Sequence, residues 1–225
     1  LASSRSGVLR VDDDIDINMV FEVGKMAWGP RLVENTPWGI SRINLKGVGG
    51  TGRGVKVGVL DTGVDSAHPD IGRNVKGGMD TVSGTASVRD DNGHGTHVSG
   101  TIAALRNGVG VVGVAPEASV YSVKVLDSRG SGKLSNLVQG MEWCVSQQIK
   151  VVNLSLSASK ENQTFREVVI AARKAGITMV CAAGNSGPSP NTVGYPARYV
   201  ETIAVGAIDD RNSVPNFSSR GMEIV

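Results

Sequence analysis

The chain has 225 residues, and 23 basic against 21 acidic side chains leave a net charge of +2 at pH 7. No long run of one charge sign occurs, so the sequence does not predict a nucleic-acid surface. No apolar stretch approaches the roughly 20 residues of a membrane span, so no contact with a membrane is predicted either. A hydrophobic fraction of 40% with only 4% aromatic residues predicts one globular core built from Val, Ile, Leu and Ala.

The amino-terminal segment differs in character from the rest of the chain. Residues 8–17 combine an apolar run with a cluster of aspartates, which predicts a strand followed by an acidic stretch. The same composition is typical of an ordinary acidic amino-terminal arm.

Further along the chain, short β-branched runs alternate with helical patterns. The predicted strands are residues 55–60, 119–126, 151–156, 177–182 and 202–205. The predicted helices are residues 96–105, 133–148 and 162–175, the last ended by Gly176. This alternation predicts an α/β fold, a doubly wound and mostly parallel β-sheet flanked by helices, with ligands at the carboxyl ends of the strands.

The two cysteines give little information about function. Cys144 falls in a predicted helix and Cys181 in a predicted strand, and their spacing fits neither a disulfide framework nor a metal site. We expect both to be buried free thiols. They neither establish nor exclude an oxidising compartment.

Two short segments carry candidate chemistry. Asp61 directly follows an apolar strand, so its carboxylate is expected in the crevice at the carboxyl end of the sheet. His94 lies just before a predicted helix of small residues and is flanked by Gly93 and Gly95, which allow close approach of the backbone. A carboxylate that orients an imidazole, which then deprotonates a hydroxyl, is the arrangement of acyl-transfer hydrolases.

Other interpretations of these residues exist. An isolated Asp61 would be read as a turn or helix cap, and it is the histidine segment about 30 residues later that favours catalysis. His94, His97 and Asp61 could alternatively bind zinc, because two histidines at i and i+3 on a helix can chelate a metal. The segment lacks the glutamate of the usual zinc-protease motif.

The segments around Asp61-Thr62-Gly63 and His94-Gly95-Thr96-His97 closely resemble the subtilisin-like serine proteases, or subtilases. The resemblance runs from about Thr36 to the last residue and implies a subtilisin-like fold. It implies that Asp61 is the orienting acid and His94 the general base of a serine endopeptidase. It also implies that Asn185 is the side-chain donor of the oxyanion hole.

The resemblance extends to two segments that flank an extended peptide substrate and pair with it as added strands. These implied substrate-binding residues are Gly130, Ser131, Gly132, Leu154, Ser155, Leu156 and Ser157. Ser157 stands where the family usually has glycine, and we expect it to narrow the pocket for the residue before the scissile bond.

Residues 105–111 resemble the high-affinity calcium loop of the family. The resemblance implies a structural Ca²⁺ ion bound by side-chain and main-chain oxygens, which suit a hard cation. The implied ligands are Glu34, Asp70, Leu105, Asn107, Val109 and Val111. The alternative is a glycine-rich surface turn without metal.

The resemblance also predicts how the chain is organised. Residues 1–33 are expected to be a propeptide tail or an amino-terminal extension, and residues 34–225 an incomplete catalytic domain whose carboxyl-terminal part is missing. The family places its nucleophilic serine in a Gly-Thr-Ser-Met-Ala segment, and no such segment occurs in residues 1–225. We therefore expect the serine to lie beyond this chain and the fragment alone to be inactive.

These expectations define a function and its partners. The predicted function is hydrolysis of polypeptide substrates, with the chain's own propeptide as an intramolecular inhibitor and a monomeric complete enzyme. A secreted or extracellular protein is expected rather than a cytoplasmic one. The alternative function is a non-catalytic subtilase-like module that binds peptides or regulates a partner.

Overall fold

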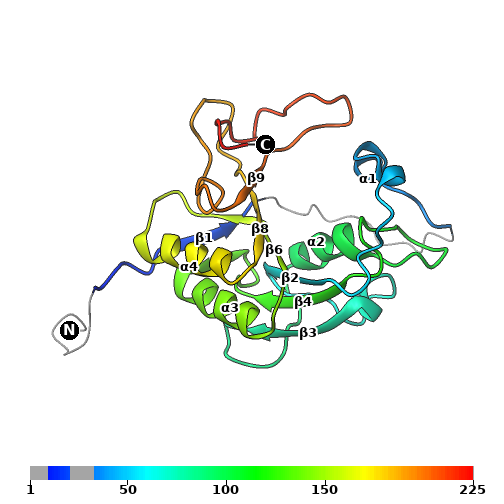
Figure 1. Cartoon of the computed structure of the whole chain (residues 1–225), viewed down its shortest axis with the longest axis horizontal. Helices are drawn as coiled ribbons and strands as arrows, with labels where there is room; N and C mark the ends of the chain where they lie inside the picture. The colour runs from blue at the N-terminus through cyan, green and yellow to red at the C-terminus, as the bar shows by residue number, and fades with distance from the viewer. Residues whose placement is uncertain (1–9, 21–32, 225) are drawn as a thin grey trace.

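Figure 1 shows the computed structural model of the chain, which describes residues 10–20 and 33–224. The predictions for residues 1–9 and 21–32 lie outside the described residues. No helix within the two described ranges combines the length and the apolar character needed to span a membrane.

A six-stranded sheet forms the centre of the fold, with the strand order β3-β4-β2-β6-β8-β9 and parallel pairing throughout. Its strands are β2 (Lys56–Asp61), β3 (Val75–Asp80), β4 (Ser119–Lys124), β6 (Val151–Leu154), β8 (Thr178–Ala182) and β9 (Ile203–Val205). The strand order reverses direction after β2, which confirms the predicted doubly wound α/β fold.

Helices cover both faces of this sheet (Figure 1). Helix α2 (His94–Ala103) lies on one face, and α3 (Leu134–Ser146) and α4 (Gln163–Lys174) lie on the other. Helix α1 (Trp38–Arg42) lies apart from the sheet, and 3₁₀ turns occur at Leu45–Gly47 and Gly72–Asn74. Successive residues of β2 point to opposite faces: Leu60 joins the core under α3 and α4, and Val59 joins a smaller core with Ala103 of α2. The sequence of β2 is an almost continuous apolar run because this strand is buried on both faces.

Both cysteines lie in the larger core as free thiols, as predicted. Burial raises the pKa of Cys144 and of Cys181 to about 12, so neither thiol is a thiolate near neutral pH.

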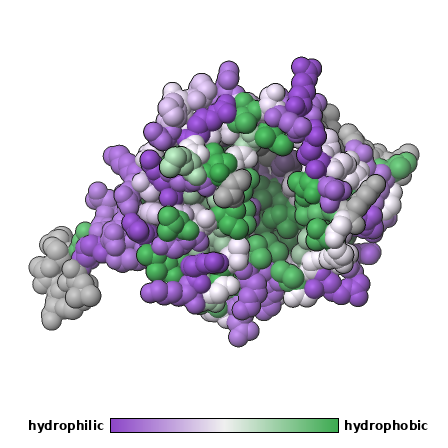
Figure 2. Space-filling model, turned by 45° about the horizontal axis from the view of Figure 1, so that its top comes forward, coloured by the Kyte–Doolittle hydropathy of each residue, from purple (hydrophilic) through white to green (hydrophobic). Residues whose placement is uncertain are grey.

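The edge of the sheet at β9 is less covered than its centre. Ile203 and Val205 of β9 are 40% and 43% exposed, whereas Val59 and Leu60 in the central strand β2 are fully buried. The molecule is hollowed on the face seen in Figure 2, where hydrophobic residues gather inside the hollow and hydrophilic residues surround it. Apolar surface is therefore open to solvent at the β9 edge and inside the hollow.

A second, three-stranded sheet lies beside the carboxyl ends of the central strands. The amino-terminal strand β1 (Asp16–Met19) pairs antiparallel with β5 (Ser131–Lys133) on one side and β7 (Leu156–Ser157) on the other. Residues 10–15 form no strand, and β1 follows the aspartate cluster. The start of the predicted strand, at residues 8 and 9, lies outside the described residues. The run at 151–156 is also two strands, since the chain leaves the central sheet at Ser155.

Candidate active site

Asp61 is the last residue of β2, and its side chain is completely buried. One carboxylate oxygen, Oδ1, accepts hydrogen bonds from the Thr62 backbone N–H at 2.7 Å and from His94 Nδ1 at 2.6 Å. The other oxygen, Oδ2, is buried and has no hydrogen-bond partner among the described residues. A buried carboxylate therefore faces the imidazole at short range.

His94 is the first residue of α2 and is only 1% exposed. Because an ionised carboxylate can only accept, Nδ1 carries the proton of the bond to Asp61 and Nε2 is left with its lone pair. No residue in the described ranges is hydrogen-bonded to Nε2. The imidazole is thus held in the tautomer that a general base requires.

Glycines allow the helix to start this close to Asp61. Gly93 precedes α2 with φ 106°, a conformation that favours glycine. A Cβ at Gly95 would lie 2.1 Å from the carbonyl oxygen of Gly63, so any side chain there would push α2 away from the turn after β2. Gly95 is therefore required by lack of space, and Gly93 by its backbone conformation.

His97 does not join the pair. Its side chain is exposed, and burial of part of the ring, with a smaller contribution from the charge of His94, lowers its pKa. Within residues 10–20 and 33–224, no three His, Cys, Asp or Glu side chains come together as metal ligands. The zinc interpretation therefore receives no support from the geometry.

The two segments predicted to bind substrate contact an extended part of the chain itself, residues 16–20. In the first segment, Gly132 is paired with Ile17, and the carbonyl of Gly130 accepts the Met19 N–H at 2.9 Å. In the second segment, the carbonyl of Ser155 accepts the Val20 N–H at 2.9 Å. These are main-chain contacts of the kind that bind peptides by strand addition.

Of the remaining residues in the two segments, some pair with β1, in what we call the groove, and one lies in the core. Ser131 is paired with Asn18, and its hydroxyl donates to the Asn18 side chain at 2.8 Å. Leu156 and Ser157 in β7 pair with Met19 and Asn18. Leu154 instead lies buried in β6, and no β1 partner is formed there.

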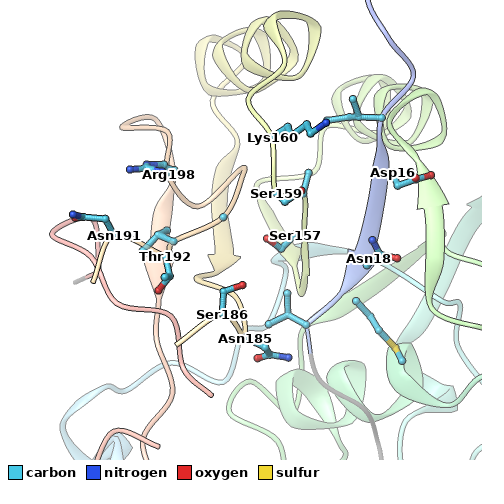
Figure 3. A pocket seen from close by; sticks show the side chains of 16 residues that line it. Asp16, Asn18, Ser157, Ser159, Lys160, Asn185, Ser186, Asn191, Thr192 and Arg198 are labelled. Atoms are coloured by element: carbon cyan, nitrogen blue, oxygen red, sulfur yellow. The ribbon is translucent and has the colours of Figure 1, made fainter. Parts of the chain in front are cut away.

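A cavity of about 630 Å³ opens beside β1. Its walls include Val20, Ser157, Gly194 and Asn185. Figure 3 shows β1 running down this pocket, with Asn185 near the carboxyl end of the strand. Asn185 is exposed, and its side-chain amide has no hydrogen-bond partner in the described part of the chain, so its donors are available to a ligand.

The hydroxyl of Ser157 points at Gly194 across this pocket. A Cβ built on Gly194 would lie 2.0 Å from Ser157 Oγ, which means that the hydroxyl already occupies that space. The structure therefore places an extra atom where a glycine at position 157 would leave room.

The acidic arm before β1 (residues 10–15) is attached to the starts of two helices. The carboxylate of Asp14 accepts the Ser135 N–H at 2.8 Å and the Ser135 hydroxyl at 2.7 Å at the start of α3. The carboxylate of Asp12 accepts the Thr164 N–H at 3.1 Å and its hydroxyl at 2.6 Å at the start of α4. Carboxylates suit helix amino termini because the backbone N–H groups there lack partners.

A comparison with family models matches residues 52–224 to the model described as the subtilase family. The chain belongs to the subtilase family. It is 49% identical over 197 residues to Subtilisin E of Bacillus subtilis (strain 168), covering 85% of this chain and 51% of that protein. It is 48% identical over 191 residues to Subtilisin Savinase of Lederbergia lenta, covering 84% of this chain and 69% of that protein. This subtilase chain thus spans about half the length of Subtilisin E.

Two carboxylates are hydrogen-bonded to the predicted calcium loop, residues 105–111. Glu34 Oε2 accepts the backbone N–H groups of Asn107 and Gly108 at 2.9 and 3.0 Å. Asp70 accepts the Asn107 side-chain amide at 3.0 Å and the Val111 N–H at 2.8 Å. Both carboxylates therefore lie against the same loop.

Some main-chain carbonyl groups of this loop accept hydrogen bonds, and others accept none among the described residues. The carbonyls of Gly108 and Gly110 accept hydrogen bonds from the Glu34 and Asn35 N–H groups. Among the residues that the structure describes, no hydrogen bond is accepted by the carbonyls of the three other predicted ligands, Leu105, Val109 and Val111. The Asn107 amide oxygen accepts the Val109 N–H at 3.0 Å. Two carboxylates and three unpaired carbonyls are oxygen groups of the kind that Ca²⁺ binds.

Sequence reasoning missed two charged residues beside the acid–base pair. Asp90 lies between β3 and α2, and Lys124 ends β4 with only 5% of its surface exposed. The run Asp90-Asp91-Asn92-Gly93 carries a turn signal that could have indicated a helix cap at Asp90. No sequence signal indicates that Lys124 would be buried at this end of the sheet.

Proposed function

We propose that this subtilase chain supplies the acid, the base and the peptide groove of a serine endopeptidase. The observation that carries the proposal is the buried 2.6 Å contact between Asp61 and His94, located at the carboxyl end of the central strands beside a groove that pairs with an extended peptide. Acid, base and peptide are brought together from separate segments of the chain.

In this mechanism His94 Nε2 removes the proton from a serine hydroxyl as the hydroxyl attacks the scissile carbonyl. The resulting imidazolium is stabilised by Asp61, which also fixes the tautomer. Asn185 donates its amide hydrogen to the oxyanion of the tetrahedral intermediate. Loss of such a donor costs about 10²–10³ in turnover, a magnitude measured on a subtilisin.

The nucleophile in this proposal is a serine that is not among residues 1–225. This expectation is supported by the absence of any hydrogen bond from a serine to His94 Nε2 within the described ranges. The 225-residue chain alone should then bind peptide in its groove without hydrolysing it.

The test is intact mass of the natively purified protein before and after treatment with a fluorophosphonate, which labels only an activated serine. A species heavier than 23.4 kDa that gains one probe mass supports the triad. The His94→Ala variant is the control and should not be labelled. A heavier wild-type species that stays unlabelled would contradict the catalytic proposal.

The amino-terminal arm and β1 are proposed to act as the chain's own propeptide and inhibitor. The register supports this proposal, since β1 takes up the groove partners that a substrate would need and Val20 lies beside Asn185 in the same cavity. The bond after Val20 would be the one presented for cleavage. Amino-terminal sequencing of the mature protein tests it, and a mature chain that begins with Val20 or an earlier residue would contradict it.

Loop 105–111 is proposed to bind a structural Ca²⁺ ion through Glu34, Asp70, Asn107 and the unpaired carbonyls. The ion would join the segment before α1 to the loop after α2 and stabilise the folded state. Saturation at 100 times the dissociation constant would add about 2.7 kcal/mol. Calcium should therefore raise the melting temperature of the wild type and leave that of Asp70→Ala unchanged, and equal shifts in both would contradict the site.

One observation favours the alternative of a non-catalytic peptide-binding module. The two segments already pair with a strand, whereas no serine among the described residues is hydrogen-bonded to His94. The fluorophosphonate experiment separates the two functions, because a peptide-binding module would bind and remain unlabelled. Secretion is still to be tested, by looking for the protein in the culture medium. The monomeric state is to be tested by measuring the molar mass with light scattering.

A further inference from the structure

The half-buried carboxylate of Asp90 is hydrogen-bonded to residues next to the acid and next to the base, and to neither Asp61 nor His94 itself. It accepts five hydrogen bonds: from the Thr62 hydroxyl, the Asn92, Gly93 and Thr96 N–H groups, and the Thr96 hydroxyl. Burial raises the pKa of this carboxyl, but the hydrogen bonds from Thr96, Gly93 and Asn92 outweigh burial and hold the pKa below its ordinary value. Asp90 is therefore a charged acceptor at neutral pH.

These donors come from both sides of the pair. Thr62 follows Asp61 in the chain, and its hydroxyl donates to Asp90 at 2.8 Å while it accepts the Gly95 N–H at 2.9 Å. The other donors belong to the first turn of α2 or to the residues just before it. Asp90 thus joins the turn that carries the acid to the helix start that carries the base.

Lys124 contacts the same turn through the backbone carbonyl of Thr62. Its ammonium donates to the Thr62 carbonyl at 2.7 Å, to the Leu126 carbonyl at 2.9 Å and to the Asp91 carboxylate at 2.7 Å. A buried ammonium needs such a complete set of acceptors, because leaving it unpaired is costly. Lys124 therefore fixes Thr62 through its backbone, while Asp90 fixes Thr62 through its side chain.

Thr62 is the residue on which both contacts converge, and it is fully buried. Its N–H donates to the same Asp61 oxygen that receives His94. Moving Thr62 would therefore displace the Asp61 carboxylate relative to the imidazole. A geometry held by several charge-assisted hydrogen bonds resists such motion better than one held by packing alone.

We propose that Asp90 and Lys124 are positioning residues that set the Asp61–His94 contact by fixing Thr62, Asp90 through the threonine hydroxyl and Lys124 through the threonine carbonyl. The proposal rests on the proposed function for its catalytic meaning, but the contact itself exists in the chain without a nucleophile. The two can therefore be tested separately.

The experiment is a proton NMR measurement on the 225-residue chain. A proton in a short bond between Nδ1 and a buried carboxylate resonates at low field, and its exchange with water reports how often the bond opens. The resonance of His94 is assigned by its loss in His94→Gln. We expect Asp90→Asn and Lys124→Met to speed this exchange on the order of tenfold or more, or to broaden the resonance away.

Control variants separate positioning from general destabilisation. Asp209→Asn removes a carboxylate that accepts N–H groups only within its own loop, and Val169→Ala loosens the core under α4. Neither should change the exchange of the His94 proton. Because Asp90→Asn could fail to fold, Thr62→Val provides a milder test by deleting only the hydroxyl link, and Thr62→Ser should rescue it.

Unchanged exchange in folded Asp90→Asn and Lys124→Met would overturn the proposal. So would a wild type without the low-field resonance, or equal effects of Thr62→Val and Thr62→Ser. Failure of the fluorophosphonate labelling would leave this result unaffected, because the NMR signal needs no serine. Faster exchange in the two variants and in Thr62→Val, with unchanged controls, supports the assignment.

Discussion

The acid–base pair and the amino-terminal arm are held by opposite physical means. Asp61 and His94 are buried at the end of a central strand, and the residues around them are joined by hydrogen bonds inside the protein. The arm lies on the surface, where the ion pair between Arg10 and Glu167 is largely exposed to solvent. Surface ion pairs contribute little and are screened by salt, whereas buried networks are rigid. The contacts of the pair therefore resist opening more strongly than those of the arm, as the proposed role of the arm as a propeptide requires.

Replacing the acid should produce the largest effect. Asp61→Asn keeps the shape of the side chain but allows the wrong tautomer of His94, so turnover in a serine-containing parent should fall by about 10⁴. The pairing of β1 in the groove should be unchanged, because no β1 contact uses Asp61. Steady-state kinetics measures turnover, and hydrogen exchange measures the pairing of β1. Loss of turnover together with loss of β1 pairing would show that the acid–base pair and the groove are not independent.

The steric requirement at the helix start should give the next largest effect. Gly95→Ala places a Cβ 2.1 Å from the Gly63 carbonyl oxygen. Such overpacking should lower the free energy of unfolding by about 1–3 kcal/mol and separate Asp61 from His94.

Gly100 provides a control for this substitution within the same helix. A Cβ at Gly100 meets nothing within 4 Å, so Gly100→Ala should leave the protein equally stable or more so, since alanine favours helices. Denaturant unfolding of both variants measures the difference. Equal stabilities would contradict the close approach at Gly95.

The parts of the fold that sequence could predict are those in which local pattern and burial agree. The helix starting at His94 and the helices α3 and α4 lie within two residues of the predicted ranges, because their apolar faces repeat at the helical period. The strand β3 was missed because its sequence contains Gly77 and Gly78 and no apolar run. Gly78 is required there by contact with the neighbouring strand, since a Cβ would lie 2.1 Å from the Ser122 carbonyl.

Site residues could be predicted where they belong to a recognisable motif. They could not be predicted where their role depends on a contact between distant parts of the chain. Asp61 and His94 come together as their segments imply. Lys124 could not be assigned, because an apolar strand that ends in lysine usually exposes the charge. The break at Ser155 was also hidden, since the apolar pattern continues on both sides of the point where the chain leaves the central sheet.

Replacing Ser157 should have a smaller effect, at the cavity beside β1. Ser157→Gly removes the hydroxyl that lies against Gly194, so the pocket beside Val20 should accept larger side chains. The preference for Phe over Val before the scissile bond should rise by roughly tenfold, the usual scale for one small group in an apolar pocket. A peptide library assayed with the serine-containing parent measures it. Ser159→Gly, in the wall of the same cavity, is the matched control, and an equal change in both variants would contradict a specific role of Ser157.

The smallest expected effect is a dependence of arm attachment on acidity. Hydrogen bonds from Thr164, followed by those from Arg10, lower the pKa of Asp12, and Arg10 lowers the pKa of Glu167 to about 2. Because these pKa values are depressed when the arm is attached, their contribution is complete above the ordinary carboxyl range near 4 and is lost as pH falls toward 2.

Hydrogen exchange of the Met19 and Val20 amides measures this attachment, because both amides donate into the groove. Exchange at pH 3 should exceed that at pH 6 by several-fold more than the intrinsic rates require, while core amides of β2 remain protected. Replacing Asp12 with Asn should remove part of this pH dependence and weaken attachment at pH 6. Equal protection of the two amides at both pH values would show that strand pairing, and not the acidic contacts, holds the arm in place.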